Sequence, residues 1–470
     1  MKGLEISEVA LSALERTWRL DAEFYAKGHL KVDALLRARK AVSLHEFALI
    51  SDGNHMGVSD EFCMQGVPYF RGGDIKEFFL SFGRPEYCVP KDVYMKPTML
   101  RSHMKKGDVF VSIVGAIIGQ IGMKTDDAPA LCSCKLGILR PKNIKTGAYL
   151  AAFLLSSIGQ SQIWRFRRGS AQTGLILDDF EQLFAPKFSG RFYDKITDIV
   201  QVALRARGGA VDKIQSAEQS LLSELGFDGW TPTEESVSVK NCSDFMSAGR
   251  FDAEYFQPKY DEIVAKIKTY SGGTIKAASV LITGLVNESE DTPERYVELA
   301  DIGVSGEIEG CTNAMFGELP SRARQRMATG QVIASSIEGS LDRCALVMPE
   351  YDKALCSTGF HRFCSQDINP ETMLLLFKSW PIQQLMKRGC SGTILCGILP
   401  GALEHVDLPV VNPEVQKVLA VKVRESFALR AESTRLLDLA KHAVEVAIEQ
   451  GEDKAIKSLG ADYQYDIEEV

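Results

Sequence analysis

Several patterns that mark common protein classes are missing from this sequence. No run of about 18 apolar residues occurs, so we expect no membrane-spanning helix, and the first residues lack the apolar core of a signal peptide. There is no Gly-x4-Gly-Lys-Ser/Thr phosphate loop of the kind found in ATP-driven motors. There is also no Pro-Pro pair, and hence no Pro-Pro-Tyr or Pro-Pro-Phe motif of an N6-adenine methyltransferase. We therefore expect a cytoplasmic protein that carries neither of these two catalytic machineries.

Metal-binding patterns are missing as well. The chain has eleven cysteines and seven histidines, but no Cys-x-x-Cys occurs, and Cys132 and Cys134 are only two positions apart. A structural zinc site needs four converging ligands at typical spacings. We predict reduced thiols, no metal site and no cofactor.

An excess of positive charge is absent too. The formal net charge is −8 over 470 residues. This value argues against a protein that coats nucleic acid by bulk attraction. Local basic clusters, or a partner that supplies most phosphate contacts, remain compatible with it.

The chain does contain an internal repeat. Residues 19–25 read Arg-Leu-Asp-Ala-Glu-Phe-Tyr, and residues 250–256 read Arg-Phe-Asp-Ala-Glu-Tyr-Phe. Further landmarks follow in the same order in both halves, which indicates a tandem duplication. The matched segments are Val67–Ile75 with Glu294–Ile302, Lys106–Ser112 with Thr329–Ser335, Leu131–Ser133 with Leu355–Ser357, and Arg168–Ser170 with Arg388–Cys390.

Hydrophobic spacing predicts the elements of each half. The first half should contain helices at 21–39 and 148–164 and strands within 68–75, 105–115 and 131–139. The second half should open with a helix at about 253–269. The paired acids Asp21 with Glu23 and Asp252 with Glu254 either cap these opening helices or pair with basic residues of a partner.

A long helix is predicted at the end of each half, at 191–226 and 414–450. Apolar residues alternate at spacings of three and four, as in a coiled-coil seam. Arg207 fills one seam position, Gly208-Gly209 weakens the first helix, and Gly226 and Gly451 follow the two ends. The seam residues are Ile196, Val200, Ala203, Ala210, Ile214, Ala217 and Leu221, and Leu419, Val423, Phe427, Leu437, Ala440, Val444 and Ala447.

Two helices with one apolar seam each can satisfy each other by packing antiparallel. About 36 residues span roughly 54 Å, so the pair would hold two domains at a fixed distance, like a ruler. The alternative is that each helix packs back on its own half. Beyond Gly451 we expect a polar, loosely ordered tail.

These landmarks resemble a known family. Arg250–Tyr260, Pro68–Ile75, Lys106–Ser112 and the loop Gly169–Gly174 are similar to segments of the specificity (S) subunits of type I restriction-modification systems, over nearly the whole chain. The second half departs from the pattern, since Ala300 replaces Gly73 and the loop at 388–393 lacks a glutamine.

The resemblance implies an α+β fold with two tandem homologous α/β target-recognition domains, separated by a long antiparallel two-helix coiled coil. It implies that the two domains read the two parts of a split double-stranded DNA site, and that the helices dock methyltransferase (M) subunits, probably two. Restriction (R) subunits would join for cleavage. The expected division is 1–188 (first recognition domain), 189–228 (spacer helix), 229–249 (linker), 250–411 (second recognition domain), 412–451 (spacer helix) and 452–470 (tail).

DNA contacts are expected from side chains that reach base edges or phosphates. In the first half the candidates are Arg71, Lys76, Arg165, Arg167, Arg168, Gly169, Ser170, Gln172 and Thr173. In the second half they are Arg322, Arg324, Arg326, Arg343, Lys387, Arg388, Ser391 and Thr393. The alternate spacing of Arg322, Arg324 and Arg326 would place them on one strand face.

Two other functions compete with this one. The chain could be a nuclease or modification enzyme with two catalytic halves, which metal-dependent activity of the purified chain would favour. It could also be a scaffold that joins two proteins without touching DNA. The missing catalytic motifs favour the non-catalytic specificity subunit.

Overall fold

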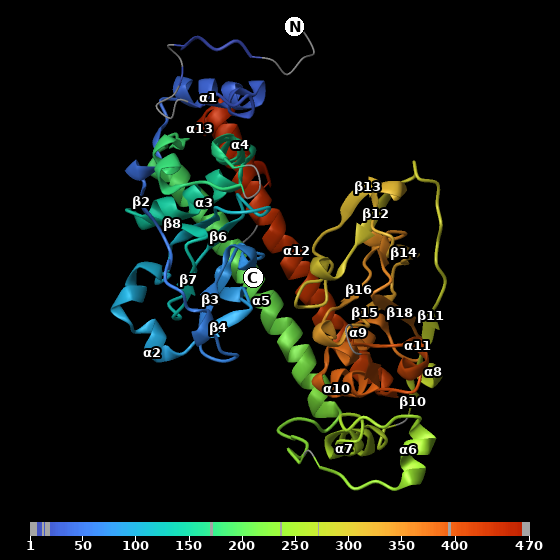
Figure 1. Cartoon of the computed structure of the whole chain (residues 1–470). Helices are drawn as coiled ribbons and strands as arrows, with labels where there is room; N and C mark the ends of the chain where they lie inside the picture. The colour runs from blue at the N-terminus through green and yellow to red at the C-terminus, as the bar shows by residue number, and fades with distance from the viewer. Residues whose placement is uncertain are drawn as a thin grey trace. The chain divides into compact units, whose positions relative to one another are not determined.

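Helices and strands are mixed along the whole described chain, which agrees with the predicted α+β class (Figure 1). The computed structural model describes residues 7–11, 14, 19–169, 173–235, 237–270, 272–392 and 396–462. The chain divides into two compact units, unit 1 (residues 1–208 and 431–470) and unit 2 (residues 209–430). No helix of the described part is long and apolar enough to cross a membrane.

Two sheets form the centre of unit 1. The larger has the order β2-β8-β5-β6 with antiparallel neighbours, and the smaller has the order β4-β3-β7 with β3 and β7 parallel. All of β5 is buried, as its β-branched and aromatic residues lead one to expect. The strands are β1 (Val42–Ser43), β2 (Ala48–Asp52), β3 (Val67–Phe70), β4 (Tyr87–Val89), β5 (Val109–Ser112), β6 (Ile121–Met123), β7 (Leu131–Cys132), β8 (Leu136–Pro141) and β9 (Phe184–Ala185), which pairs with β1.

The helices of unit 1 differ from the prediction at two points. The helix predicted at 21–39 begins only at Lys27, because Glu23–Tyr25 form a separate short turn (η2) and the backbone of Ala26 is extended. The segment predicted as a single helix at 148–164 is broken at Ser156, whose extended backbone ends α3 and whose hydroxyl accepts the N–H of Gly159 to cap α4. The apolar spacing runs through this break, so the spacing alone does not reveal it. The helices are α1 (Lys27–Ala38), α2 (Lys91–Tyr94), α3 (Gly147–Leu155) and α4 (Ser157–Phe166).

The sheets of unit 2 have the same strand order as those of unit 1. The order β11-β18-β15-β16 corresponds to β2-β8-β5-β6, and β13-β12-β17 corresponds to β4-β3-β7, with β12 and β17 parallel. β14 extends the second sheet. The strands are β10 (Gly272–Thr274), β11 (Val280–Ile282), β12 (Pro293–Val297), β13 (Thr312–Met315), β14 (Ala323–Arg326), β15 (Val332–Ser335), β16 (Cys344–Leu346), β17 (Leu355–Ser357), β18 (Phe360–Cys364), β19 (Cys390–Ser391), β20 (Gly397–Ile398) and β21 (Asp407–Pro409).

The helices of unit 2 repeat the break seen in unit 1. α9 ends at Ser379 and α10 begins directly after it. The helix predicted at 253–269 is shorter, because Pro258 begins α7. The helices are α6 (Cys242–Ala248), α7 (Pro258–Ile267), α8 (Ile275–Ala278), α9 (Pro370–Lys378), α10 (Trp380–Gly389) and α11 (Pro400–Leu403).

Both long helices are present, as α5 (Gly190–Glu224) and α12 (Pro413–Gln450), and each contributes a segment to each unit. In unit 1, Ser433 Oγ donates to the carbonyl of Ala203 at 2.8 Å, and the N–H of Ser189 donates to Glu452 at 3.0 Å. In unit 2, Ser426 Oγ donates to the carbonyl of Ala210 at 2.6 Å. Residue numbers fall along one segment as they rise along the other, so the two segments of unit 1 run antiparallel.

Most of the predicted seam is buried, but Phe427 and Leu437 are only partly so. Leu436 is fully buried beside the predicted Leu437. Arg207 is buried as well, but its side chain pairs with Glu77 and lies over the ring of Phe82, so it is engaged with the sheet domain of unit 1 and not with the apolar seam. Further residues, such as Ile199 and Val202, are buried beside the seam. Within unit 1 the helix segments therefore pack both on each other and on the sheets and helices of that unit. The arrangement of the two units as a rod with domains at its ends stays a prediction.

The segment after Gly451 is a helix, not the loosely ordered tail that its polar composition predicts. Gly451 has a φ of +100°, which ends α12, and α13 (Glu452–Asp462) follows. Ala455 and Leu459 of α13 are buried in the core of unit 1, which holds the helix in place. Residues 463–470 of the predicted tail lie outside the described residues.

Candidate nucleic-acid interface

The repeated Arg-x-Asp pattern builds the same local structure in each unit. Asp21 and Asp252 each accept the backbone N–H three residues later at 3.1 Å and so close a short turn. The prediction that they cap the opening helices is wrong, because α1 begins only at Lys27 and α7 only at Pro258. Each aspartate also forms a two-point ion pair, with Arg19 and Arg250 respectively. Burial would raise the pKa of Asp21, but its bonds with Arg19 outweigh this and lower it; the bond with Arg250 lowers the pKa of Asp252.

The two arginines of this pattern hold the chain where a helix ends. Arg19 donates to the carbonyls of Phe166 and Arg167, both at 2.9 Å, directly after α4. Arg250 donates to the carbonyl of Cys390 at 2.8 Å, directly after α10. The pattern therefore anchors the opening segment of each half to the same place in its own unit.

This anchoring corrects the alignment of the two halves. Arg165 donates to the carbonyl of Phe24 at 3.1 Å and lies over that ring at 4.3 Å. Arg388 donates to the carbonyl of Tyr255 at 3.1 Å and lies over that ring at 4.6 Å. Arg165, not Arg168, is the counterpart of Arg388. The predicted pairing was wrong by three residues, because one Arg-Gly dipeptide lies in the loop after α4 whereas the other ends α10. Arg165 is only 6% exposed, so its guanidinium is engaged within unit 1.

The other arginines of the loop after α4 are partly exposed and paired. Arg167 lies over the ring of Trp164 at 4.6 Å and pairs with Glu23. Arg168 pairs with the buried carboxylate of Asp179. Glu23 thus links the opening segment to this loop, whereas Asp21 closes the turn at Phe24.

The remainder of the predicted loop is described in part. Gly169 is exposed, and the carbonyl of Thr173 accepts the N–H of Gly115 at 2.9 Å. Ser170 and Gln172 lie outside the described residues.

Arg71 lies in front of a tight turn, η5 (Gly72–Asp74), that follows β3. Its guanidinium pairs with Glu86 and stacks over the ring of Tyr87 at 4.4 Å. Burial would lower the pKa of Arg71, but the bonds with Glu86 and Asp74 outweigh this and raise it. Lys76, two residues after the turn, is exposed.

In unit 2 the turn η10 (Leu299–Asp301) follows β12, and Glu298 stands in front of it. Arg322 donates to Glu298 at 2.8 Å and to the hydroxyl of Tyr296 at 3.1 Å, which together raise the pKa of the guanidinium. A hollow of about 490 Å³ opens beside the turn. It is lined by Glu298, Leu299, Ala300, Arg322, Ser336, Ile337, Ser357, Thr358 and Gly359.

The three arginines at 322, 324 and 326 do not share one strand face as their spacing predicts. A β-bulge interrupts the alternation between Ala323 and Gln325. Arg326 pairs with Glu294 of β12 at 2.6 Å. The same strand bears Tyr296, whose hydroxyl accepts from Arg322. Arg324 instead lies over the ring of Phe316 at 4.4 Å.

The remaining candidates of unit 2 are dispersed. Arg343 donates to the carbonyl of Ile302 at 2.7 Å, close to the η10 turn. Lys387 lies 3.9 Å from the carboxylates of two glutamates, and Ser391 is exposed. Thr393 lies outside the described residues.

Sequence reasoning misses two basic residues of unit 1. Asp52, buried at the end of β2, accepts from His55 at 2.7 Å and pairs with Arg101. Both basic side chains are exposed, and the one carboxylate holds them together. They lie 46 positions apart in the sequence, so no local pattern joins them. The hydroxyl lining of the unit 2 hollow is missed for a different reason, because serines carry no charge to single them out.

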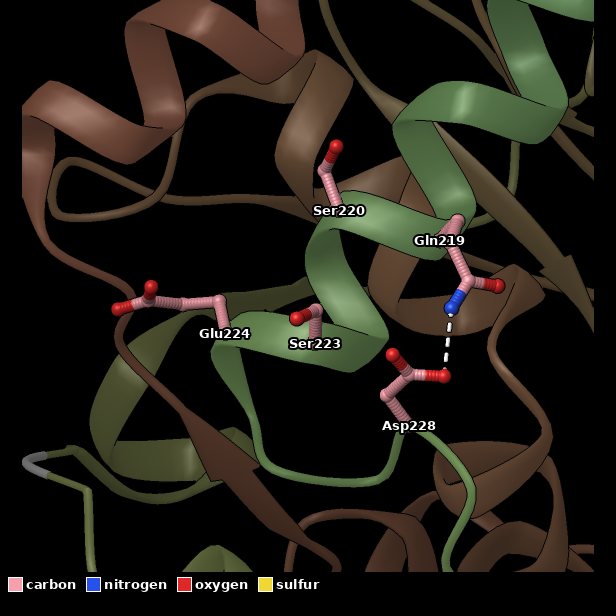
Figure 2. Close-up of a pocket in the computed structure, with 5 residues that line it drawn as sticks. All are labelled: Gln219, Ser220, Ser223, Glu224 and Asp228. Atoms are coloured by element: carbon pink, nitrogen blue, oxygen red, sulfur yellow. Dashed lines mark hydrogen bonds between the residues drawn. The ribbon is translucent and has the colours of Figure 1, made fainter.

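A second hollow, of about 470 Å³, lies at the end of α5 in unit 2 (Figure 2). Gln219 donates to Asp228 across it at 2.7 Å. Two of its five side chains are carboxylates, so it does not suit a phosphate backbone. It is lined by Gln219, Ser220, Ser223, Glu224 and Asp228.

Within the described chain, no group of three or more His, Cys, Asp or Glu side chains is placed to hold a metal ion. All eleven cysteines are free. Burial raises the pKa of the Cys344 and Cys356 thiols to about 12. Those two thiols therefore stay protonated at neutral pH.

Comparison with known proteins gives matches among solved structures. No family model and no curated protein matches the chain. An S subunit of a type I restriction-modification system from M. genitalium matches with a TM-score of 0.36 at 12% identity, over 89% of this chain and 95% of that one. The HsdS subunit from Thermoanaerobacter tengcongensis matches with a TM-score of 0.29 at 12% identity, over 87% and 96%.

Two of the matched chains are thus S (HsdS) subunits by description. A third match, with a TM-score of 0.29 at 12% identity over 87% of this chain and 97% of that one, comes from a structure described as the basis of complex assembly and conformational transition of the type I R-M system. At these TM-scores the likeness by itself carries no functional argument.

Proposed function

We propose that this chain is the DNA-specificity subunit of a type I restriction-modification complex. The observation that carries the proposal is the duplicated architecture. Each unit has the same sheet order and the same Arg-x-Asp anchor, and each receives a segment of both long helices. Two homologous domains in one chain are what a reader of a two-part DNA site requires.

The two domains read different half-sites. Basic side chains held by carboxylates, such as Arg71 with Glu86 and Arg101 with Asp52, are suited to contact DNA at defined positions. The domains carry different side chains at matching places, so the target is asymmetric. With a net charge of −8, the chain alone binds DNA weakly, and its partners supply further phosphate contacts.

Catalysis belongs to the partners. The long helices dock methyltransferase subunits, and restriction subunits join the assembly. Within unit 2, Val418 and Val421 of α12 are 55% and 53% exposed and lie three positions apart, hence on one helix face. Exposed apolar residues that share a face are suited to a protein interface.

Co-expression with the methyltransferase subunits encoded beside it tests the proposal. The chain should co-purify with them, and methylation mapping of the host DNA should show one asymmetric, two-part motif. Methyltransferase, ATPase or nuclease turnover that follows this chain alone, and that is lost on a point mutation within it, would overturn the proposal. So would a complex without sequence-dependent binding.

The docking face can be tested in the same system. Val421→Asp introduces a charge into the proposed interface and should reduce co-purification of the methyltransferase by about tenfold or more, since one buried charge costs more than 1.4 kcal/mol. Leu285→Asp, on another exposed apolar side chain of the same unit, is the control and should leave co-purification unchanged. Equal retention by both variants would remove this face from the interface.

A further inference from the structure

The turns after β3 and β12 have the same construction. In unit 1 the carboxylate of Asp74 accepts the N–H of Arg71 at 2.8 Å. In unit 2 the carboxylate of Asp301 accepts the N–H of Glu298 at 2.8 Å. The backbone of the residue in front of each turn is thus fixed by an aspartate three positions later. Its side chain is not needed for that bond and is free to differ.

Each unit also has a second turn, and the two second turns have the same construction. Ser133, at the end of β7, accepts the N–H of Lys135 at 3.3 Å, and Ser357, at the end of β17, accepts the N–H of Gly359 at 3.1 Å. In unit 1 a Cβ added to Gly72 of the first turn would lie 3.6 Å from Lys135. In unit 2 the corresponding residues line one hollow. Arg71 and Glu298 are therefore equivalent positions, at the rim of equivalent surfaces.

The two side chains at this position carry opposite charges within a similar setting. Arg71 is accompanied by Glu86 and Tyr87, whereas Glu298 is accompanied by Arg322 and the hydroxyl of Tyr296. Arginine, glutamate and tyrosine occur in both sets, with the arginine and the glutamate exchanged. Arg71 and Glu298 remain 39% and 37% exposed, so both are oriented and still accessible.

We propose that Arg71 and Glu298 are the specificity-determining residues of the two halves, each reading one base in the major groove. This inference rests on the proposed function and adds the class of base. A guanidinium donates to guanine O6 and N7, whereas a carboxylate accepts from an exocyclic amino group, that of cytosine N4 or adenine N6. Arg71 therefore selects guanine in one half-site. Glu298 selects an amino-bearing base in the other, and Glu86 and Arg322 are the positioning residues.

Methylation mapping of the complete complex tests the assignment. Arg71→Ala should relax a guanine requirement at one position of one half-site. Sites that carry another base at that position should then gain methylation by about tenfold or more, relative to sites that carry guanine. Glu298→Gln should relax a requirement for cytosine or adenine at one position of the other half-site. The base found at that position in the wild-type motif shows which of these two bases Glu298 reads. In each variant the untouched half-site should keep its sequence, which shows that the chain is folded.

Controls on charge come from the same units. Arg37→Glu in unit 1 and Glu404→Arg in unit 2 alter exposed or half-exposed charges that pair with Asp33 and Lys276, and should leave the motif unchanged. If the wild-type complex has a two-part motif and both Arg71→Ala and Glu298→Gln leave that motif unchanged, this inference is wrong and the proposed function stands. A wild-type complex without any two-part motif would overturn the proposed function and, with it, this inference.

Discussion

Arg207 of α5 and Glu77 form a two-point ion pair inside unit 1, with Nη2–Oε1 at 2.6 Å and Nε–Oε2 at 3.2 Å. The Arg207 side chain is only 4% exposed. Unit 2 contains the counterpart, in which Arg430 of α12 lies 2.7 Å from Glu307. In each unit, a long helix is thus held to the sheet domain by an arginine–glutamate pair that is mostly removed from solvent.

Breaking this pair should destabilise unit 1. Arg207→Ala leaves a mostly buried carboxylate unpaired and should lower the free energy of unfolding by about 3–5 kcal/mol. The double variant Arg207→Met with Glu77→Leu removes both charges and should cost less than the single change. Denaturant unfolding measures both. Arg205→Ala, on an exposed neighbour in the same helix, should change stability by no more than about 0.5 kcal/mol. If Arg207→Ala lowers the free energy of unfolding no more than Arg205→Ala does, the pair has no stabilising role.

The Asp21 carboxylate, which bonds Arg19 and the N–H of Phe24, should give stability a defined pH dependence. Its pKa is lowered from 3.8 in the folded chain, so its contribution is complete above that value and is lost as the pH falls through the folded pKa. Asp21→Ala removes the hydrogen bond to the N–H of Phe24 and the ion pair with Arg19, and should cost about 0.5–2.5 kcal/mol at pH 7. The difference from wild type should shrink as the pH drops below 3.8. Urea unfolding at several pH values checks this, and a constant difference down to pH 2 would refute it.

Arg165 should matter for folding more than for DNA affinity. Arg165→Ala removes a stacking contact of about 0.5–2 kcal/mol and a charged hydrogen bond of about 1.5–3 kcal/mol, so a loss of roughly 2–5 kcal/mol is expected. Arg165→Lys should not restore the stability, because an ammonium lacks the planar stacking surface. Thermal unfolding of these variants beside Arg37→Ala provides the measurement. A stable Arg165→Ala variant with lost DNA binding would reverse the assignment.

The helix pair should set the gap between half-sites, which we expect at roughly 5–8 bp for half-sites centred about one helical turn apart. Matched insertions of four residues near Ala210 and near Arg430 add about 6 Å of helix rise. That length is close to two base-pair steps of about 3.4 Å each. Methylation mapping should show a gap about two base pairs longer with unchanged half-sites. An unchanged gap with altered half-sites would refute the ruler.

Patterns that repeat in the sequence predicted most of the fold. The seam spacing found α5 and α12 to within two residues at each end, because a 3.6-residue period over ten turns leaves little freedom. The Arg-x-Asp repeat identified a real structural unit, the anchor of each half. Ser156 was missed because the apolar residues continue on both sides of it, and only its own backbone and hydroxyl end the helix.

The candidate site was less predictable. Arg165 looks like an exposed loop arginine in sequence, yet Phe24, more than a hundred positions earlier, supplies the ring and the carbonyl that bury it. Glu298 was not singled out because a carboxylate argues against DNA contact until the turn around Asp301 shows that it occupies the position of Arg71. Tertiary partners, not local sequence, decide which charges are available.

The division of both long helices between the units also bears on synthesis. Unit 1 includes residues 431–470, so the apolar side of Ile196 and Ala203 is complete only when the last part of the chain has left the ribosome. At about 5–20 residues per second, the roughly 220 intervening residues take about 10–45 s to make. During that time the N-terminal domain exposes a strip of hydrophobic surface. A premature stop anywhere between residues 229 and 430 would therefore leave a first domain that cannot close its own core.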